Sequence, residues 1–377
     1  MIFNKFKSNF ARNLVNIPGI KTSKKIVVLE SDDWGSIRMP SKVVFDKLAK
    51  EHLYPEIDPY LRYDTLASVN DFNAMFDILR SVKDHKGNHP IVTANAVMGN
   101  PDFDKIAEHK FESYFWESFT TTWKKHSHCE GVEAAWHYGI TEKFLRFQCH
   151  GREHINVDQW MLALQQGDKL VRKAFDHQMI SISSQPNRLR FHFMEGLDYF
   201  SEAEKENKKV ILKEALLFFK QYFGYESKSY IANCYIWDSA VESALAELGV
   251  VYLQGMTNQI QPVLKDGIHS HQYKRHFFGE QNKFGQHYLI RNAFFEPSLN
   301  TDINWISECL QRINIAFRWN KPAIIGCHRL NFIGSIHEEN RTKNLEQFGM
   351  LLKEIVKRWP DVEFKSSDEV INYIKNE

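Results

Sequence analysis

Residues 24–35 read Lys-Lys-Ile-Val-Val-Leu-Glu-Ser-Asp-Asp-Trp-Gly. The aliphatic run from Ile26 to Leu29 shows no alternation of apolar and polar residues. This pattern predicts a strand that is covered on both faces, as in a parallel sheet with helices packed outside it. The run ends in two adjacent carboxylates, Asp32 and Asp33. Because ligand sites in such sheets lie beyond the carboxyl ends of the strands, we expect these two side chains to lie at a site.

The adjacent carboxylates have two explanations. Two neighbouring negative charges repel each other, and a cation or a shared proton relieves that repulsion, which favours a metal site. An acidic turn in which Asp33 caps a helix over residues 36–50 accounts for the same residues without a metal. The stretch by itself favours neither explanation.

Length and composition limit the classes of protein to consider. The chain of 377 residues is long enough for one large α/β barrel or for two domains. It has 48 basic and 47 acidic residues, and these are scattered along the sequence, which gives no electrostatic case for nucleic-acid binding. Aromatic residues make up a high 14% of the chain; some of them suit stacking on sugars, while core packing explains most.

The cysteines and the apolar segments indicate a compartment. Five cysteines without paired spacing argue against a disulfide framework and fit a reducing environment. No segment approaches the roughly twenty apolar residues that span a bilayer, and the N-terminus lacks the apolar core of a signal peptide, so we expect a cytoplasmic protein. Residues 1–22 form a basic, amphipathic segment, for which docking on the protein's own domain is favoured over peripheral contact with a membrane.

The rest of the chain alternates predicted strands with amphipathic helices. Repeated β-then-α units predict an α/β fold with a closed or nearly closed barrel and a site at its carboxyl-terminal mouth. We expect a single catalytic domain over residues 1–377, with insertions at about 102–143 and 255–286. The further predicted strands are 90–97, 144–149, 229–238, 250–253, 287–292, 323–327 and a short one at 362–364.

Two histidines follow a predicted strand in the middle of the chain. His150 and His154 are four residues apart, which puts both imidazoles on one face if a helix begins there. His85 and His89 have the same spacing but lie in a turn before a strand, so the spacing alone is weak evidence. The position of the first pair at a strand end favours metal ligands.

Three groups of residues together resemble the motifs of the polysaccharide deacetylase superfamily. The family's first motif, Thr-Phe-Asp-Asp-Gly, resembles residues 30–35, which contain an added Trp34. Its second motif, His-Ser/Thr-x-x-His, resembles residues 150–154, and its last, Leu-x-His, fits residues 326–328 by position. The motifs follow the family's order over roughly residues 24–370.

The resemblance implies a fold and a reaction. Members of the family have a distorted barrel of seven or eight strands and a divalent metal, usually Zn²⁺. By resemblance, Asp33, His150 and His154 are the metal ligands, Asp32 is the general base and His328 protonates the leaving group. The implied activity is a metal-dependent hydrolase in which a metal-bound water attacks the acetyl carbonyl, so that an N- or O-acetyl group is removed from a sugar or polysaccharide.

One motif departs from the family. The third motif, Arg-x-Pro-Tyr, corresponds at best to residues 232–235, Ala-Asn-Cys-Tyr, which lack the arginine that orients the base in relatives. Arg152 and Arg291 are the candidates to replace it. We expect a backbone N–H near Tyr235 to stabilise the oxyanion. The residues expected to bind substrate are Trp34, Tyr235, Arg152, Arg291 and Glu296.

Two other functions remain open at this point. A glycoside hydrolase of related barrel fold needs two carboxylates across a sugar, and Glu296 could pair with Asp32 or Glu30 in that role. A catalytically inactive glycan-binding relative would keep the metal and lose turnover.

Overall fold

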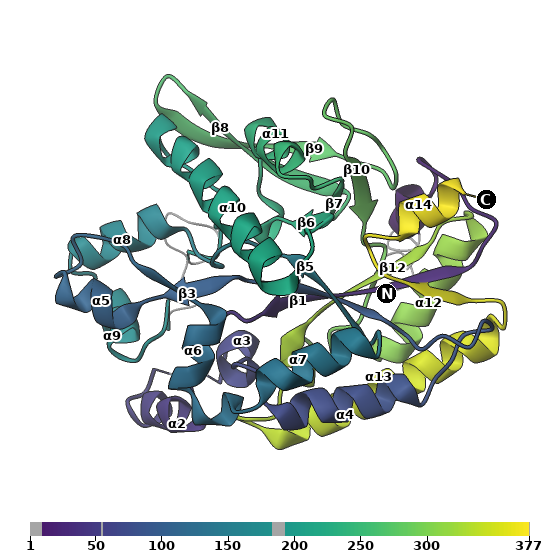
Figure 1. The fold of residues 1–377 in the computed structure, drawn as a ribbon, viewed down its shortest axis with the longest axis horizontal. Coiled ribbons are helices and arrows are strands. Elements are labelled where there is room, and N and C mark those ends of the chain that lie inside the picture. Colours follow the sequence, from purple (N-terminus) through teal and green to yellow (C-terminus); the bar gives the residue numbers. More distant parts are fainter. Residues whose placement is uncertain (1–9, 54–55, 183–192, 377) are drawn as a thin grey trace.

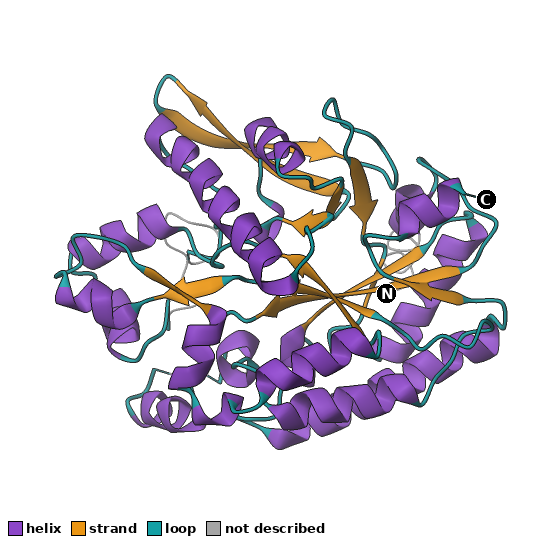
Figure 2. Ribbon diagram, in the orientation of Figure 1, coloured by secondary structure: helices purple, strands orange, loops and turns teal. Residues whose placement is uncertain are grey.

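The computed structural model describes residues 10–53, 56–182 and 193–376. Its centre is a nine-stranded sheet in which every pairing is parallel, with helices on both sides (Figures 1 and 2). The predicted α/β fold class is therefore confirmed. The strands are β1 (Ile26–Trp34), β2 (Val92–Ala96), β5 (Leu145–Cys149), β6 (Ser229–Ile231), β7 (Tyr252–Gly255), β10 (His287–Ile290), β11 (Ala293–Phe294), β12 (Ala323–His328) and β13 (Glu363–Lys365).

Strand β1 is buried along its whole length, as its unbroken apolar run predicts. It pairs with β2 and with β12, and its first residues also pair with β13. In the pairing with β12, Asp32 lies opposite His328. The first and last predicted motifs thus meet at the carboxyl ends of two neighbouring strands.

The order of the sheet is β10-β7-β6-β5-β2-β1-β12-β11. Its two ends, β10 and β11, are successive parts of one segment, residues 287–294. At the step between them, the Arg291 N–H donates to the Gly255 carbonyl on β7 (2.9 Å), and the Asn292 N–H donates to the Ile324 carbonyl on β12 (3.1 Å). One bent segment therefore contacts both ends of the strand order. A fully closed barrel of seven or eight strands stays a prediction.

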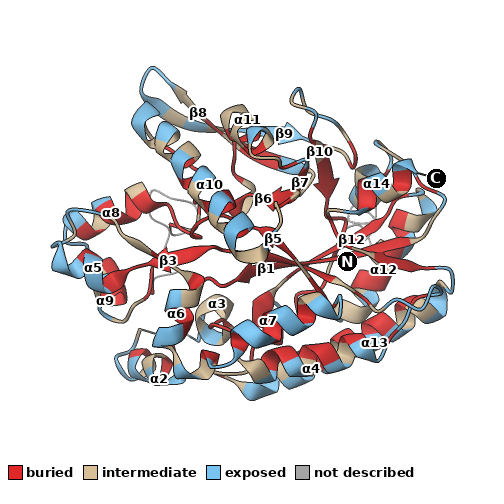
Figure 3. Cartoon of the chain, viewed as in Figure 1, coloured by how far each residue is buried: buried red, intermediate tan, exposed pale blue. Residues whose placement is uncertain are grey.

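The helices bury apolar stripes against the sheet (Figure 3). Helices α4 (Val69–Arg80), α7 (Val132–Thr141) and α13 (Glu338–Arg358) lie on one side of it, and α10 (Glu202–Phe223) and α11 (Ser239–Glu247) lie on another (Figure 1). Helix α4 shows why such a segment is helical. Ser68 and Asp71 form a capping box at its start, and its buried residues Phe72, Met75, Phe76 and Leu79 follow helical spacing.

The other elements surround this framework. The predicted insertion at 102–143 contains short helices and one short strand, and the insertion at 255–286 contains a long hairpin. The remaining helices are α2 (Lys42–Lys50), α3 (Pro59–Tyr63), α5 (Phe103–Glu108), α6 (Phe119–Lys125), α8 (Val157–Gln165), α9 (Lys169–Asp176), α12 (Trp305–Arg318) and α14 (Val370–Lys375), with 3-10 helices η1 (Ser127–Cys129), η2 (Asn233–Tyr235) and η3 (Arg329–Phe332). The remaining strands are β3 (Gly99–Pro101), β4 (Trp116–Ser118), β8 (Asn258–Lys265) and β9 (Ile268–Arg275).

The described part of the basic N-terminal segment lies against the domain. Residues 10–16 are helical, and Arg12 pairs with Glu308 of α12. Asn13 accepts a hydrogen bond from the Trp319 indole (2.8 Å). Residues 1–9 of the predicted segment fall outside the described residues. Among the helices described, none is long and apolar enough to cross a membrane.

Candidate metal centre and its pocket

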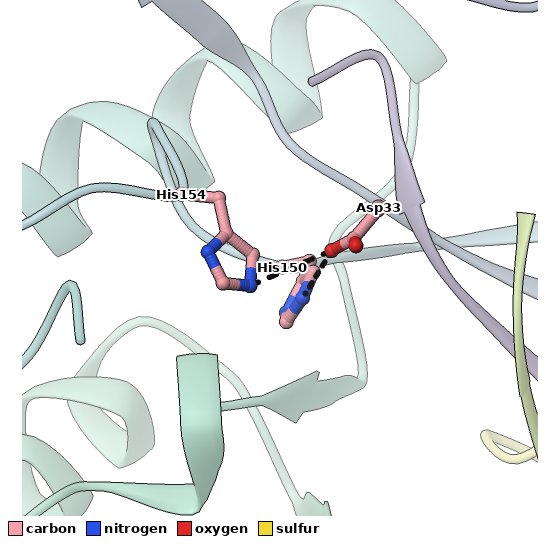
Figure 4. A group of neighbouring side chains, drawn as sticks. All are labelled: Asp33, His150 and His154. Carbon is pink, nitrogen blue, oxygen red and sulfur yellow. Dashed lines mark ion pairs between the residues drawn. The ribbon is translucent and has the colours of Figure 1, made fainter. Parts of the chain in front are cut away.

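Asp33, His150 and His154 converge at the carboxyl end of the sheet. Asp33 is the last residue but one of β1, His150 directly follows β5, and His154 lies in the loop before α8. Both imidazoles point toward the Asp33 carboxylate (Figure 4). The Nε2 atoms of His150 and His154 lie 3.4 and 3.5 Å from Asp33 Oδ1. The helix-cap explanation of Asp33 is wrong, because the next helix, α2, is capped by Ser41.

The shared helical face for His150 and His154 is also wrong. Gly151 has φ 111°, and helix α8 begins only at Val157. The Gly151 and Arg152 carbonyls accept hydrogen bonds from the backbone N–H groups of residues 98 and 99. Because these carbonyls are bonded to a neighbouring segment, the stretch cannot start a helix. The two rings meet through a loop that is tied to the end of β2.

The spacing of these three side chains fits a metal better than it fits hydrogen bonds. Asp33 Oδ1 and His154 Nδ1 are buried and have no hydrogen-bond partner among the described residues. A buried anion without a partner is costly. Zn–N and Zn–O bonds of 2.0–2.2 Å at tetrahedral angles hold ligand atoms about 3.3 to 3.5 Å apart, which agrees with the two observed spacings. His150 Nδ1 lies 2.8 Å from the Ile231 carbonyl, so its proton is on Nδ1 and Nε2 offers a lone pair.

The protonation states also suit a metal. Burial lowers the pKa of His154 to about 3, so this imidazole is neutral at pH 7. Burial raises the pKa of Asp33, but the neighbouring His154 and Arg38 outweigh it and hold that pKa well below its usual value. Divalent metals bind neutral imidazoles and ionised carboxylates, so Asp33 and His154 are in the form that a ligand requires.

Asp32 points to a different partner from Asp33. Arg291 holds it in a bidentate pair, with Nη1 2.6 Å from Oδ2 and Nη2 2.7 Å from Oδ1, and the Asn95 amide donates to Oδ1 at 2.8 Å. Burial raises the pKa of Asp32, but Arg291 outweighs it and the pKa falls to about 2. Of the two arginines considered to replace the missing motif arginine, Arg291 is the one that contacts Asp32, and its Nε also pairs with Glu30 (2.6 Å).

His328 is fixed from behind by a carboxylate. Its Nδ1 lies 2.7 Å from Glu296 Oε1, and Glu296 Oε2 accepts from the Asn331 amide at 2.7 Å. His328 Nε2 lies 3.9 Å from Asp32 Oδ2. Burial lowers the pKa of His328, but Glu296 outweighs it and raises the pKa to about 9, so the ring is cationic at pH 7.

The three candidate metal ligands, Asp32 and His328 line one cavity of about 420 Å³, a volume typical of a small-molecule site. Its polar lining contains the five residues predicted as ligands, base and acid, together with Arg38, Asp58 and Ser181; the five are Asp32, Asp33, His150, His154 and His328. Its remaining wall is largely apolar and includes Ile37, Leu61, Ile180, Met194, Ile231 and Ala232, with Tyr60 and Tyr235 among the lining side chains.

Of the five residues predicted to bind substrate, one lines the cavity, two contact the residues that line it, and two lie elsewhere. Tyr235 lines the cavity, but its N–H donates to the Ala232 carbonyl (3.0 Å), while its hydroxyl accepts from Arg291 at 3.3 Å. Arg291 and Glu296 stand behind Asp32 and His328. Trp34 is buried against Phe72 in the core, and Arg152 pairs with Glu153 and Glu214 beneath two aromatic rings.

Sequence reasoning missed several contacts of this site. Asn95 and Asn331 bind the base and the partner of the acid, and Arg38 lies 3.4 Å from Asp33 Oδ2. A signal existed for Asn95, because it is a polar amide near the carboxyl end of a buried strand. Arg38 lies in a loop and Asn331 in the short 3-10 helix η3, where no periodic pattern distinguishes them.

Comparison with known proteins gives structural neighbours only. No family model matches the sequence, and no curated protein matches it. A probable polysaccharide deacetylase from Pseudomonas aeruginosa PAO1 superposes with a TM-score of 0.47 at 8% identity, covering 94% of this chain and 92% of that one. The PuuE allantoinase gives 0.43 at 11% identity, covering 92% and 89%. The 4-alpha-glucanotransferase of Thermococcus litoralis gives 0.43 at 10% identity, where 93% of this chain spans 40% of the enzyme.

Proposed function

We propose that this protein is a metal-dependent hydrolase that removes an N- or O-acetyl group from a sugar or polysaccharide. The observation that supports the proposal most concerns the buried Asp33 Oδ1, which has no hydrogen-bond partner among the described residues and which two imidazole nitrogens face at 3.4 and 3.5 Å. Beside it stand a second carboxylate in a separate ion pair and a cationic histidine. A metal site, a carboxylate base and a cationic acid are the groups that metal-assisted acyl transfer to water uses.

The residues fit a divalent ion, and Zn²⁺ best matches two imidazoles and one carboxylate with an open position. Asp33, His150 and His154 would hold it. When bound, the ion would polarise the acyl carbonyl and make water a stronger nucleophile at neutral pH.

Asp32 is suited to accept the proton of the attacking water. Arg291 and Asn95 fix its orientation and keep it ionised, so it cannot turn away to bind the metal with Asp33. The pair between Arg291 and Asp32, here called the Arg291 clamp, has the effect that the missing motif arginine is expected to have. Arg291 follows β10, the first strand of the sheet order, whereas Asp32 is on β1, near the other end of that order. A base fixed in this way loses no orientational freedom when the reaction begins.

His328 is suited to protonate the leaving amine or alcohol. Its Nδ1–H donates to Glu296, which directs Nε2 into the cavity. The carboxylate also favours the charged imidazole, so a proton is present on Nε2 at neutral pH. This arrangement follows the same logic as an imidazole oriented by a buried carboxylate in other hydrolases.

The glycoside-hydrolase alternative has less support. It requires a second carboxylate across the sugar from Asp32, with Glu296 and Glu30 as the candidates. Glu296 is bonded through its two oxygens to His328 and Asn331. Glu30 is buried and pairs with Arg291 and Ser367.

Acetate release from a panel of N- and O-acetylated sugars, with Zn²⁺ supplied, tests the proposal. We expect the unmodified protein to release acetate and Asp32→Asn to lower turnover by about 10²- to 10⁴-fold, because the general base is lost. The Asp32→Asn variant should keep its metal, since Asp32 is not among the ligands. Asp302→Asn, which changes an exposed aspartate, is the control. Release at the same rate by Asp32→Asn would contradict the assigned role, and release from no acetylated sugar would contradict the activity.

A further inference from the structure

A second group of metal-ligating side chains lies outside the cavity. His269 Nε2 is 2.9 Å from Asp198 Oδ1, and His271 Nε2 is 3.0 Å from Asp198 Oδ2. The three side chains bring their ligand atoms within 4.8 Å of one another. None of them takes part in the mechanism above.

The hairpin geometry explains why the two histidines converge. His269 and His271 are two residues apart on β9, so their side chains leave the strand on the same face. In the antiparallel pairing with β8 they lie opposite Leu264 and Pro262. Their ring centroids are 4.7 Å apart, and both rings address one carboxylate. The His-x-His spacing on a strand thus makes a two-nitrogen site without help from another element.

The carboxylate is held in place from several directions. Asp198 is fully buried, its Oδ1 accepts the Tyr199 N–H at 2.9 Å, and its own carbonyl accepts from the Asn156 amide at 3.0 Å. Phe200 packs against the His269 ring with centroids 4.2 Å apart. A fixed, buried carboxylate that faces two imidazoles is a preorganised set of ligands, because the orientation of the carboxylate is set before an ion binds.

We propose that Asp198, His269 and His271 bind a second divalent transition-metal ion. Two imidazole nitrogens and one carboxylate oxygen suit Zn²⁺, and they also suit Ni²⁺ and Cu²⁺. The side chains of His269 and His271 are 18% and 23% exposed, so an ion has access from solvent. The two N···O spacings are those of hydrogen bonds to different oxygens of the Asp198 carboxylate. The spacing to the oxygen that binds the ion would widen by about 0.4 Å, to the distance between two ligand atoms of a tetrahedral metal. Each imidazole then has its proton on Nδ1 and its lone pair on Nε2.

Such an ion would join two segments that are far apart in the sequence. Asp198 lies just before α10, and the histidines lie on the β8–β9 hairpin beside that helix (Figure 1). The ion would tie the predicted insertion at 255–286 to the body of the domain, which is the effect of a structural metal.

Zinc binding by the full-length protein tests this site. The protein is stripped of metal, titrated with Zn²⁺ by calorimetry, and its metal content is measured after gel filtration. We expect two ions per chain in the unmodified protein and one in His269→Ala/His271→Ala. The control is His126→Ala/His128→Ala, which removes a histidine pair of the same spacing whose rings are 5.7 Å apart and should leave two ions.

A second variant distinguishes loss of the metal site from loss of the fold. Asp198→Asn keeps the size of the side chain and removes its charge, and we expect its affinity for the second ion to fall at least tenfold. An equal zinc count in the unmodified protein and in His269→Ala/His271→Ala would overturn the proposal. Because the proposal does not use Asp33, loss of an ion from His150→Ala/His154→Ala is a separate result that concerns the first site alone.

Discussion

Asp33 adopts φ 73°, a left-handed conformation that is uncommon for residues other than glycine. Such a backbone costs about 1 to 3 kcal/mol and persists where the surroundings impose it. Here it turns the Asp33 carboxylate toward the two imidazoles, while its neighbour Asp32 faces Arg291. Asp33 Oδ2 also lies 3.4 Å from Arg38, so the two adjacent carboxylates have different cationic partners, Arg38 and Arg291, which relieves the repulsion that their adjacency implies.

The Glu296→Gln substitution tests the residue-scale account of His328. In metal-free protein we expect it to lower the pKa of His328 from about 9 toward 6.5, because the charge that favours the imidazolium is removed. The raised pKa stabilises the fold fully below about pH 6.5, and this contribution is lost as the pH rises through about 9. The unfolding free energy should therefore fall less between pH 6 and 9.5 in the variant. NMR titration of the His328 ring, with denaturant unfolding at both pH values, measures the two effects; the same His328 titration in both proteins would contradict the account.

At the scale of elements, the site depends on how β1, β12 and the bend after β10 fit together. Gly326 on β12 lies opposite Glu30 of β1, and a Cβ placed on it would come within 2.7 Å of Arg291 Cδ. The absence of a side chain at this position lets Arg291 cross β12 and reach Asp32.

Gly326→Ala tests this fit. We expect the added methyl to displace Arg291, to lower the unfolding free energy by about 1 to 3 kcal/mol and to reduce turnover by tenfold or more. Metal content should be unchanged, since the ligands come from other residues. In Gly349→Ala on α13 the new Cβ would lie 3.3 Å from Ile78 Cδ1, the end of a flexible side chain, so this control should keep full turnover. Full turnover in Gly326→Ala would show that the Arg291 clamp is unimportant.

The elements were predictable where local pattern determines them. The unbroken run of β1, the polar ends of β5 and β12, and the amphipathic helices gave the fold class and gathered Asp33, His150, His154 and His328 at one edge. The local structure after His150 was mispredicted, because contacts with the end of β2 and not the local pattern set the backbone there. Arg291 could be listed only as a candidate, because its contact with Asp32 arises from the bend between β10 and β11.

At the scale of the whole molecule, a buried polar network connects strands across the sheet. The Asn95 amide bonds both Asp32 and Gln254, and Gln254 in turn bonds Ser229, so β1, β2, β7 and β6 are linked through side chains. All four side chains are buried. Such a network fixes the relative positions of strands that are distant in the sequence, and with them the positions of the residues that line the cavity.

The central claim is that Asp33, His150 and His154 form a metal site. The most direct measurement is elemental mass spectrometry of the purified full-length protein beside His150→Ala/His154→Ala, after exposure of both to Zn²⁺. His85→Ala/His89→Ala, a pair of the same spacing whose Nδ1 atoms contact backbone carbonyls, is the matched control. The account predicts one ion fewer in His150→Ala/His154→Ala and no loss in the control. Equal metal content in all three proteins would contradict it.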